Sequence, residues 1–399
     1  MPSDSYDYSA TIDEMMPGVI ADRRHLHQHP ELSFQEFETA AFVADRLQAL
    51  GLEEIKTGVG KTGVTGLIKG TGASGSGKVL MLRADMDALP ILEENEVEYV
   101  SQHPGVMHAC GHDSHVSMLL GTTRVLMNRR GDFAGTVKVL FQPAEEGGGG
   151  ASAMRADGAL ENPKVDAAMG IHIWQDVPCG DVWVREGTAM VGVTGFTITV
   201  KGKGGHGAHP ELSVDPIVIG SAIVNGLLTL VSREKSPVTP EVVSIGYFRS
   251  GNAANVIPDT AVLKGTIRSV TKEQGNEVRQ RLQALVEGIA SSMGATASIV
   301  FAGSAPPLVN DPGIAGIVRD AAIEGFGEAR VSAGNLMSVS EDFGEFLDPV
   351  PGCYFFIGSR NEEKGFVYGH HHPKFDIDEE AMGTGIEAMS RAAIKYLQS

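Results

Sequence analysis

The sequence predicts an α/β protein in which a mixed, largely parallel sheet forms one domain and a ferredoxin-like unit is inserted into it. Strands with continuous apolar runs alternate with helices in residues 1–190 and again in 305–399, as in sheets covered by helices. Residues 191–304 read β-α-β-β-α-β, an order complete in itself. We therefore expect 1–190 and 305–399 to form one discontinuous domain around an insertion at 191–304, because domain termini usually lie close together.

The elements expected before the insertion follow from their apolar periodicity. Residues 12–50 have helical spacing and end at Gly51, a natural C-cap. The continuous apolar runs and the next helical pattern then predict strands at 64–70 and 78–85, a helix at 114–130, buried strands at 135–145 and 165–174, and a short helix near 150–157.

The insertion begins with a strand at 195–203, where apolar Phe196, Ile198 and Val200 alternate with threonines, as in a half-exposed strand. The rest of the β-α-β-β-α-β order is a helix at 215–233, strands at 242–248 and 261–269, a helix at 272–292 and a strand at 296–301. The first pattern then resumes with a helix near 312–325, a strand at 353–359 and a terminal helix at 378–397.

Composition excludes several classes of function. The formal net charge of −18 leaves no basic surface to neutralise phosphates, so no nucleic-acid partner is expected. No run approaches about 18 consecutive apolar residues, so no membrane partner is expected either. The acidic N-terminus lacks the basic and apolar regions of a secretion signal, which predicts a cytoplasmic protein. Three cysteines are too few for a disulfide scaffold.

The segment from Gly72 to Val79 nearly matches the phosphate-binding loop G-x-x-x-x-G-K-[ST]. Val79 replaces the hydroxyl residue that would hold Mg²⁺, and the segment leads into a strand where a phosphate loop opens a helix. We therefore interpret it as a plain hairpin turn.

Polar residues concentrate in five segments where strands end or loops begin, which is where ligand sites gather in α/β sheets. The segments are Arg83–Pro90, His108–His115, Gln142–Gly147, Gly170–Trp174 and His370–Asp376. Three of these segments also allow a structural alternative to the functional interpretation.

In the second segment, Cys110 and His112 could form a metal-ligand pair, or a buried cysteine beside a helix-capping histidine. Of the adjacent Glu145 and Glu146, one could bind metal while the other faces substrate water, or both could lie in an exposed acidic loop. His172 lies in an apolar run, so it is either a satisfied core histidine or a ligand.

In order along the chain, the segments RRHLHQHPELSFQE, LRADMDALP, HACGHD, QPAEEG, GIHIW, GHGAHP, NVIPD and HHPKFDIDE resemble those of a family of dinuclear metal-dependent amidohydrolases. The family includes hippurate hydrolase, indole-acetyl-amino-acid hydrolase and N-acyl-amino-acid deacetylases, relatives of aminoacylase and carboxypeptidases. The resemblance covers residues 23 to 378 and implies an α/β metal-binding domain with an inserted ferredoxin-like lid.

The resemblance also implies a set of site residues. Two divalent metal ions per subunit would be held by Cys110, His112, Glu146, His172 and His371. His371 is chosen because the family's ligand stands two residues before the proline. Glu145 would be the general base. The thiolate favours Zn²⁺ or Co²⁺ over Mg²⁺, and Mn²⁺ is common in the family, so we expect Zn or Mn, with Co or Ni as further options.

The chemistry expected of this set is amide hydrolysis. Two metals convert a bridging water to hydroxide near neutral pH and accept the developing oxyanion. Glu145 would take the water proton and pass it to the leaving amine. We expect Asp87, Asp113 and also Asp85 outside the ligand set, accepting hydrogen bonds from ligand imidazoles.

The insertion would contribute to substrate binding. By resemblance, His206 of Gly205-His206 is an oxyanion-stabilising donor that reaches a substrate across the domain gap, in its own or in a neighbouring subunit, with a turn histidine as the alternative. Asn255 and Arg268 would bind the free carboxylate of the substrate, which an arginine fork matches. The segment Asn252-Ala-Ala-Asn255 departs from the family's Gly-Thr-Ala-Pro-Asn but keeps the asparagine.

We expect an N-acyl-amino-acid amidohydrolase acting on a small-molecule substrate. The family also leads us to expect a homodimer or homotetramer formed through the lid domain. A dipeptidase or carboxypeptidase on the same metals is the first alternative, and a catalytically silent metal-binding or assembly module is the second. The presence of both Glu145 and Glu146 argues against the silent module, since a storage site has no use for a base.

Overall fold

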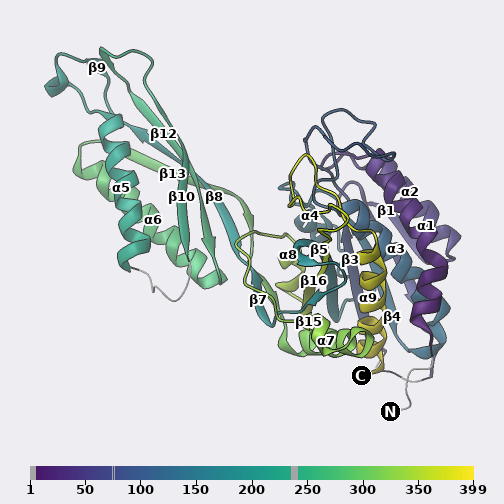
Figure 1. Ribbon diagram of the computed structural model, residues 1–399. Coiled ribbons are helices and arrows are strands. Elements are labelled where there is room, and N and C mark those ends of the chain that lie inside the picture. Colours follow the sequence, from purple (N-terminus) through teal and green to yellow (C-terminus); the bar gives the residue numbers. More distant parts are fainter. Residues whose placement is uncertain (1–5, 74, 76, 235–240) are drawn as a thin grey trace. The chain divides into compact units, whose positions relative to one another are not determined.

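The computed structural model in Figure 1 describes residues 6–73, 75, 77–234 and 241–399. The chain folds into two compact units. Unit 1 consists of Met1–Ala189, Val309–Asn335 and Asp342–Ser399, and unit 2 of Met190–Leu308 and Leu336–Glu341. Unit 2 spans the expected insertion and takes in a second short segment, 336–341, which the sequence did not indicate.

Unit 1 is built on an eight-stranded mixed sheet, as expected. In spatial order its strands are β1 (Glu53–Val59), β2 (Gly63–Lys69), β4 (Thr136–Gln142), β3 (Val79–Asp85), β5 (Ala167–Pro178), β16 (Gly352–Arg360), β6 (Val182–Trp183) and β15 (Val331–Ser332). The central strands β4, β3, β5 and β16 run parallel to one another. They are almost wholly buried, which explains their continuous apolar runs.

The prediction that residues 70–77 form a hairpin turn is wrong. β2 and β3 are not neighbours, because β4 lies between them, antiparallel to β2 and parallel to β3. The loop is therefore a connection across β4, and Gly70 and Gly72 donate to the carbonyls of Gly135 and Phe133 beside the start of that strand. Residues 74 and 76 of this loop lie outside the described residues. Local sequence shows the turn but not the strand that inserts between its ends.

The helices of unit 1 are α1 (Tyr8–Gln28), α2 (Phe37–Ala49), α3 (His112–Asn128), α4 (Gly150–Ala156), α7 (Pro312–Phe326), α8 (Gly344–Leu347) and α9 (Glu380–Gln398). α3 and α9 pack on the central strands, and α1 packs against both of them. The single helix predicted at 12–50 is in fact two, α1 and α2, separated by residues 29–36. Gly51 does adopt the left-handed conformation expected after a helix end.

Unit 2 has the element order β8 (Gly192–Lys201), α5 (Pro216–Glu234), β10 (Val242–Ser250), β12 (Thr260–Ser269), α6 (Lys272–Ser292) and β13 (Thr296–Ala305). Its sheet order is β10-β12-β8-β13, fully antiparallel, with α5 and α6 packed on it. The small strands β9 (Gly205–His206) and β11 (Val256–Ile257) pair with each other. The two remaining short strands are β7 (Gly187–Met190) and β14 (Leu308–Asn310).

Among the described residues, α5 alone is long and apolar enough to cross a membrane by length and composition. Its face with Ile219, Ile223 and Leu227 is buried in the core of unit 2. This is the arrangement of an amphipathic helix covering a sheet. The expectation of no membrane partner stays a prediction.

Candidate functional site

The candidate site of unit 1 lies where β3 and β4 end beside β5. Parallel register places Asp85 of β3 opposite Gln142 of β4, and Arg83 opposite Gly170 of β5. The segments after Asp85 and Gln142 therefore emerge at the same sheet edge, next to His172 of β5. Three of the five polar segments meet because the parallel strands that carry them are neighbours.

The N-terminus of α3 brings Cys110 and His112 to this edge. Gly111 between them has φ 85°, a left-handed conformation that favours glycine, and a Cβ there would lie 2.4 Å from Ile173 Cδ1. The helix therefore starts in close contact with β5, and the Cys110 Sγ lies 3.6 Å from His172 Nε2.

Two groups of three candidate ligands share Cys110. The ligand atoms of Cys110, His112 and His172 lie within 4.8 Å of one another, and so do those of Cys110, Glu146 and His371. Glu145 joins His112 and Glu146 in a third such group. The structure thus brings together all five predicted metal ligands and the predicted base.

The three consecutive histidines 370–372 have different surroundings. His371 has φ 65°, and its Nε2 lies 3.2 Å from Glu146 Oε1, a contact that raises the pKa of His371. His370 is turned toward Trp174, and burial lowers its pKa to about 3. His372 stacks on Tyr368. Of the three, His371 alone belongs to the ligand groups, at the position that the family resemblance indicates.

The side chains themselves show that the site fits divalent cations. His112 Nδ1 lies 2.8 Å from the Asp87 carbonyl oxygen, while its buried Nε2 has no hydrogen-bond partner among the described residues. Burial, followed by the charges of Glu146 and Glu145, raises the pKa of the Cys110 thiol well above its usual range. A cation between these groups would bind the orphaned nitrogen and stabilise the thiolate.

Asp87 is placed nearly as predicted. Its backbone oxygen accepts from the ring of His112, and its carboxylate oxygens accept from the backbone N–H groups of Glu145, at 3.0 Å, and Glu146, at 3.1 Å. Ser33 Oγ donates to the same carboxylate at 2.7 Å. Asp87 therefore orients a candidate ligand and fixes the backbone of both glutamates.

The predictions for Asp85 and Asp113 need correction, because neither accepts a hydrogen bond from a candidate ligand. Asp85 accepts from His115 Nδ1 at 2.6 Å and from Arg83 Nη1 at 2.6 Å, and lies 3.8 Å from His112 Nε2. Asp113 accepts from Arg23 Nε and from His27 Nδ1, both at 2.8 Å. Each buried carboxylate is paired with a cationic or imidazole group from another element.

Sequence reasoning missed the role of these partners. His115 links Asp85 to the backbone N–H of Ile173, the residue after His172. Arg83 is fully buried and donates to Asp85, Gln142 and Asp342. An arginine inside the apolar run VLMLRAD was the available signal, since a buried charge requires partners.

The three site residues predicted for unit 2 are not gathered in one place. His206 and Asn255 are exposed neighbours, because His206 in β9 pairs with Val256 in β11. Asn255 precedes the first residue of β12, whereas Arg268 lies next to its last residue and donates to the Ser338 carbonyl at 2.8 Å. At roughly 3.3 Å per residue, Arg268 lies about 26 Å along β12 from Thr260. One carboxylate cannot contact both Asn255 and Arg268 of the same chain.

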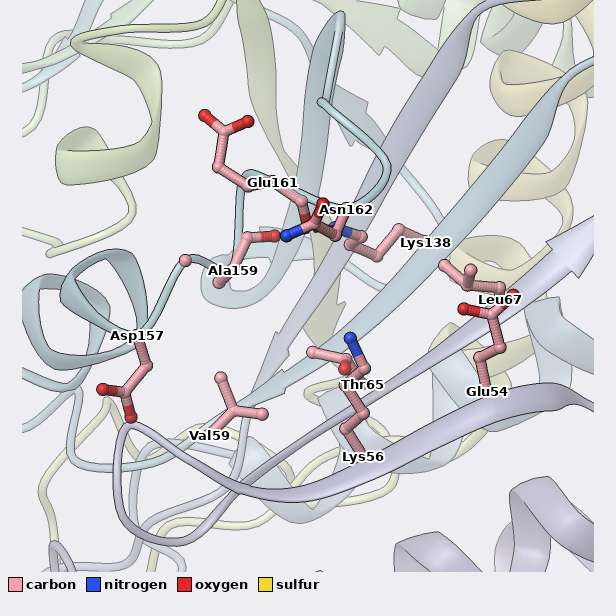
Figure 2. A pocket seen from close by; sticks show the side chains of 11 residues that line it. Glu54, Lys56, Val59, Thr65, Leu67, Lys138, Asp157, Ala159, Glu161 and Asn162 are labelled. Carbon is pink, nitrogen blue, oxygen red and sulfur yellow. Dashed lines mark hydrogen bonds between the residues drawn. The ribbon is translucent and has the colours of Figure 1, made fainter.

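A small hollow of about 50 Å³ elsewhere in unit 1 contains none of the predicted site residues. Figure 2 shows it between β1, β2, β4 and the loop at 157–162. Lys138 Nζ donates there to the carbonyls of Ala159, Glu161 and Pro163, at 2.7–3.0 Å. This lysine is fully engaged in holding the loop, so the hollow gives no indication of chemistry.

The chain is similar to known proteins over most of its length. The sequence profile of "Peptidase family M20/M25/M40" matches residues 81–395. The chain is 40% identical over 391 residues to thermostable carboxypeptidase 2 of Saccharolobus solfataricus, covering 96% of this chain and 97% of that protein. It is 39% identical over 390 residues to N-acetyl-L-cysteine deacetylase of Bacillus subtilis, covering 98% and 90%. The solved structure of the Bacillus subtilis YXEP protein, titled a dinuclear metal binding peptidase from the M20 family, matches with a TM-score of 0.84 at 34% identity, covering 97% and 99%.

Proposed function

Because the chain belongs to peptidase family M20/M25/M40, it is a hydrolase, and we propose that it cleaves the amide bond of N-acyl amino acids. The products are a carboxylate and a free amino acid. The observation that carries this proposal is the pair of ligand groups that share Cys110, with Glu145 beside them. A relative that matches 98% of this chain is named N-acetyl-L-cysteine deacetylase, which supports the proposed class of substrate.

We assign two divalent metals to these groups. Cys110, His112 and His172 would hold one, and Cys110, Glu146 and His371 the other, with Zn or Mn the expected metal and Co or Ni as further options. The neighbour titled a dinuclear metal binding peptidase supports a count of two. When bound, such metals polarise the amide carbonyl and lower the pKa of a coordinated water.

Glu145 is the proposed proton carrier. Its side chain is half-buried and lies within the group formed with His112 and Glu146. A carboxylate in that position takes the proton of the attacking water and delivers it to the leaving amine nitrogen, which leaves as a neutral amine. Glu146 serves instead as a ligand, since it is the residue in contact with His371.

His206, Asn255 and Arg268 would bind the oxyanion and the substrate carboxylate. Because Asn255 and Arg268 of one chain lie at opposite ends of β12, we propose that a complete site takes them from two chains of a homodimer or homotetramer. His206, beside Asn255, then acts in the neighbouring subunit.

Subunit complementation tests this arrangement. H206A and E145Q, each nearly inactive alone, should regain about a quarter of wild-type activity when their subunits are exchanged, because half of the randomly paired dimers contain one complete site in two. Two E145Q preparations carrying different tags, exchanged in the same way, are the control. No recovery in mixed dimers isolated by both tags would place His206 in its own subunit's site or in none.

A carboxypeptidase on the same residues is the second candidate, since the relative named thermostable carboxypeptidase 2 is as similar as the deacetylase. A hydrolysis screen separates the two. N-acetyl, N-benzoyl and indole-acetyl amino acids should be cleaved with kcat/KM well above that for dipeptides and C-terminal residues of longer peptides. Preferred cleavage of peptides would replace our proposal with the second candidate.

A further inference from the structure

The segment between α1 and α2, residues 29–36, contains a buried carboxylate that accepts a hydrogen bond from the loop carrying Glu145. Glu36 is fully buried, and both of its oxygens are used. Oε1 accepts from the backbone N–H of Phe34 and of Ala144, both at 2.9 Å, and Oε2 accepts from Thr62 Oγ1 at 2.5 Å. Ala144 directly precedes Glu145.

Glu36 has no cationic partner within the part of the chain that the structure describes. Its three donors are two backbone amides and a hydroxyl, and burial, the largest effect, raises its pKa. A buried carboxylate without a cation is costly in free energy, so the folded structure needs a compensating interaction. The bond to Ala144 supplies one, because a charged acceptor binds an N–H more strongly than a neutral one does.

The loop at 143–146 needs such a restraint. Ala144 has φ 51°, a left-handed conformation that costs a non-glycine residue about 1 kcal/mol or more. The N–H groups of Ala144, Glu145 and Glu146 donate in succession to Glu36 Oε1 and to the two carboxylate oxygens of Asp87. Three consecutive N–H groups are therefore held by two buried carboxylates, which fixes the backbone from which the Glu145 side chain extends.

We propose that Glu36 is a positioning residue of the reaction, which holds Ala144 in its left-handed conformation and so sets the place of the Glu145 carboxylate. The hydrogen bonds described for Glu36 go to Phe34, Thr62 and Ala144 and to none of the candidate ligands, so it acts through the loop. The proposal rests on the proposed role of Glu145 as proton carrier. Displacing a reacting group by about 1 Å can cost about 10²-fold in rate, so a single buried contact can matter this much.

The test compares E36A with E36Q in the metal-loaded enzyme. E36A removes all three acceptor contacts and should lower kcat about 10²-fold, with KM within about twofold and bound metal unchanged. In E36Q the amide oxygen can still accept from both N–H groups while the amide NH₂ donates to Thr62. E36Q should therefore keep kcat within about threefold of wild type. Hydrogen exchange should speed up at residues 144–146 in E36A.

V43A is the matched control. Val43 is fully buried in α2, the helix that directly follows Glu36, and its apolar side chain cannot hydrogen-bond to the loop at 143–146. V43A should lower the melting temperature while kcat stays unchanged. An E36A enzyme with wild-type kcat, or with a loss that V43A reproduces at equal melting temperature, would overturn the proposal. Faster exchange confined to α2 would do the same.

Where E36A does not fold, T62V decides, since it keeps the volume of Thr62 and removes only the hydroxyl that fixes Oε2. It should lower kcat by about threefold or more without loss of metal, and an unchanged kcat overturns the proposal. E145Q separates this inference from the proposed function. Full activity in E145Q would refute Glu145 as proton carrier, whereas an inactive E145Q with a fully active E36A would refute only the role of Glu36.

Discussion

Three candidate residues deep in unit 1 and two on the small ribbon of unit 2 are held in different ways. In unit 1, Asp85, Asp87 and His112 are buried and bonded to partners on other elements. In unit 2, His206 and Asn255 are exposed on a small two-stranded ribbon. Buried, multiply bonded groups keep their geometry before any ligand binds, which is what a metal centre and a proton carrier require. The geometry of exposed side chains such as His206 and Asn255 is fixed only when a substrate or another protein surface packs against them.

Metal removal should have the largest effect on this comparison. Chelator treatment should abolish hydrolysis, because the two groups proposed to hold the metals, which share Cys110, both lie in unit 1 and supply the metals that polarise the amide. Adding Zn²⁺, Mn²⁺ or Co²⁺ should restore the rate, measured on an N-acyl amino acid with metal content determined in parallel. Full activity in chelator, with the metal shown to be absent, would remove the metal mechanism.

E145Q should lower kcat about 10²- to 10⁴-fold while both metals stay bound, because the amide cannot accept the water proton. E146Q is the matched control on the neighbouring residue, where loss of metal should accompany loss of rate. If E145Q instead loses metal and E146Q keeps it, the roles of the two glutamates are exchanged.

The buried pairs of unit 1 should also give the protein a pH-dependent stability. Burial and Arg23 act to lower the pKa of His27, but Asp113 and Glu93 outweigh them and raise it to about 9. Because the pKa of His27 is higher in the folded than in the unfolded state, its protonation stabilises the fold. This stabilisation is complete below the unfolded pKa of about 6.5 and is lost as the pH rises through about 9.

The free energy of unfolding should therefore fall by up to about 3 kcal/mol between pH 6.5 and 9, as measured by denaturant titration of the metal-loaded protein. H27Q should flatten this dependence. The same slope in H27Q would assign it to other groups.

R268A tests unit 2 and should have the smallest effect. It should raise KM for N-acyl amino acids about tenfold while leaving KM for the corresponding amino-acid amides nearly unchanged, because only the former carry the carboxylate that a guanidinium binds. R249A, on the adjacent strand β10, is the control. Equal changes for both substrate classes would reassign the carboxylate site and leave Arg268 as a support for Ser338.

Much of this protein could be predicted from short stretches of sequence. The fold class is confirmed, and the central strands appear where continuous apolar runs predicted them. The pairs Cys110 with His112 and Glu145 with Glu146 could be identified because their members are neighbours in the chain. The choice of His371 came from the family resemblance, and its contact with Glu146 agrees with that choice.

Only the tertiary structure decided what depends on distant partners. It placed β4 between β2 and β3, gave Asp113 to Arg23 and His27, and put Asn255 and Arg268 at opposite ends of β12. It also revealed that Glu36, over a hundred residues before Ala144, accepts the N–H of that residue. Periodicity and spacing report on neighbours within a few residues, whereas strand order and buried hydrogen bonds depend on which remote segments pack together.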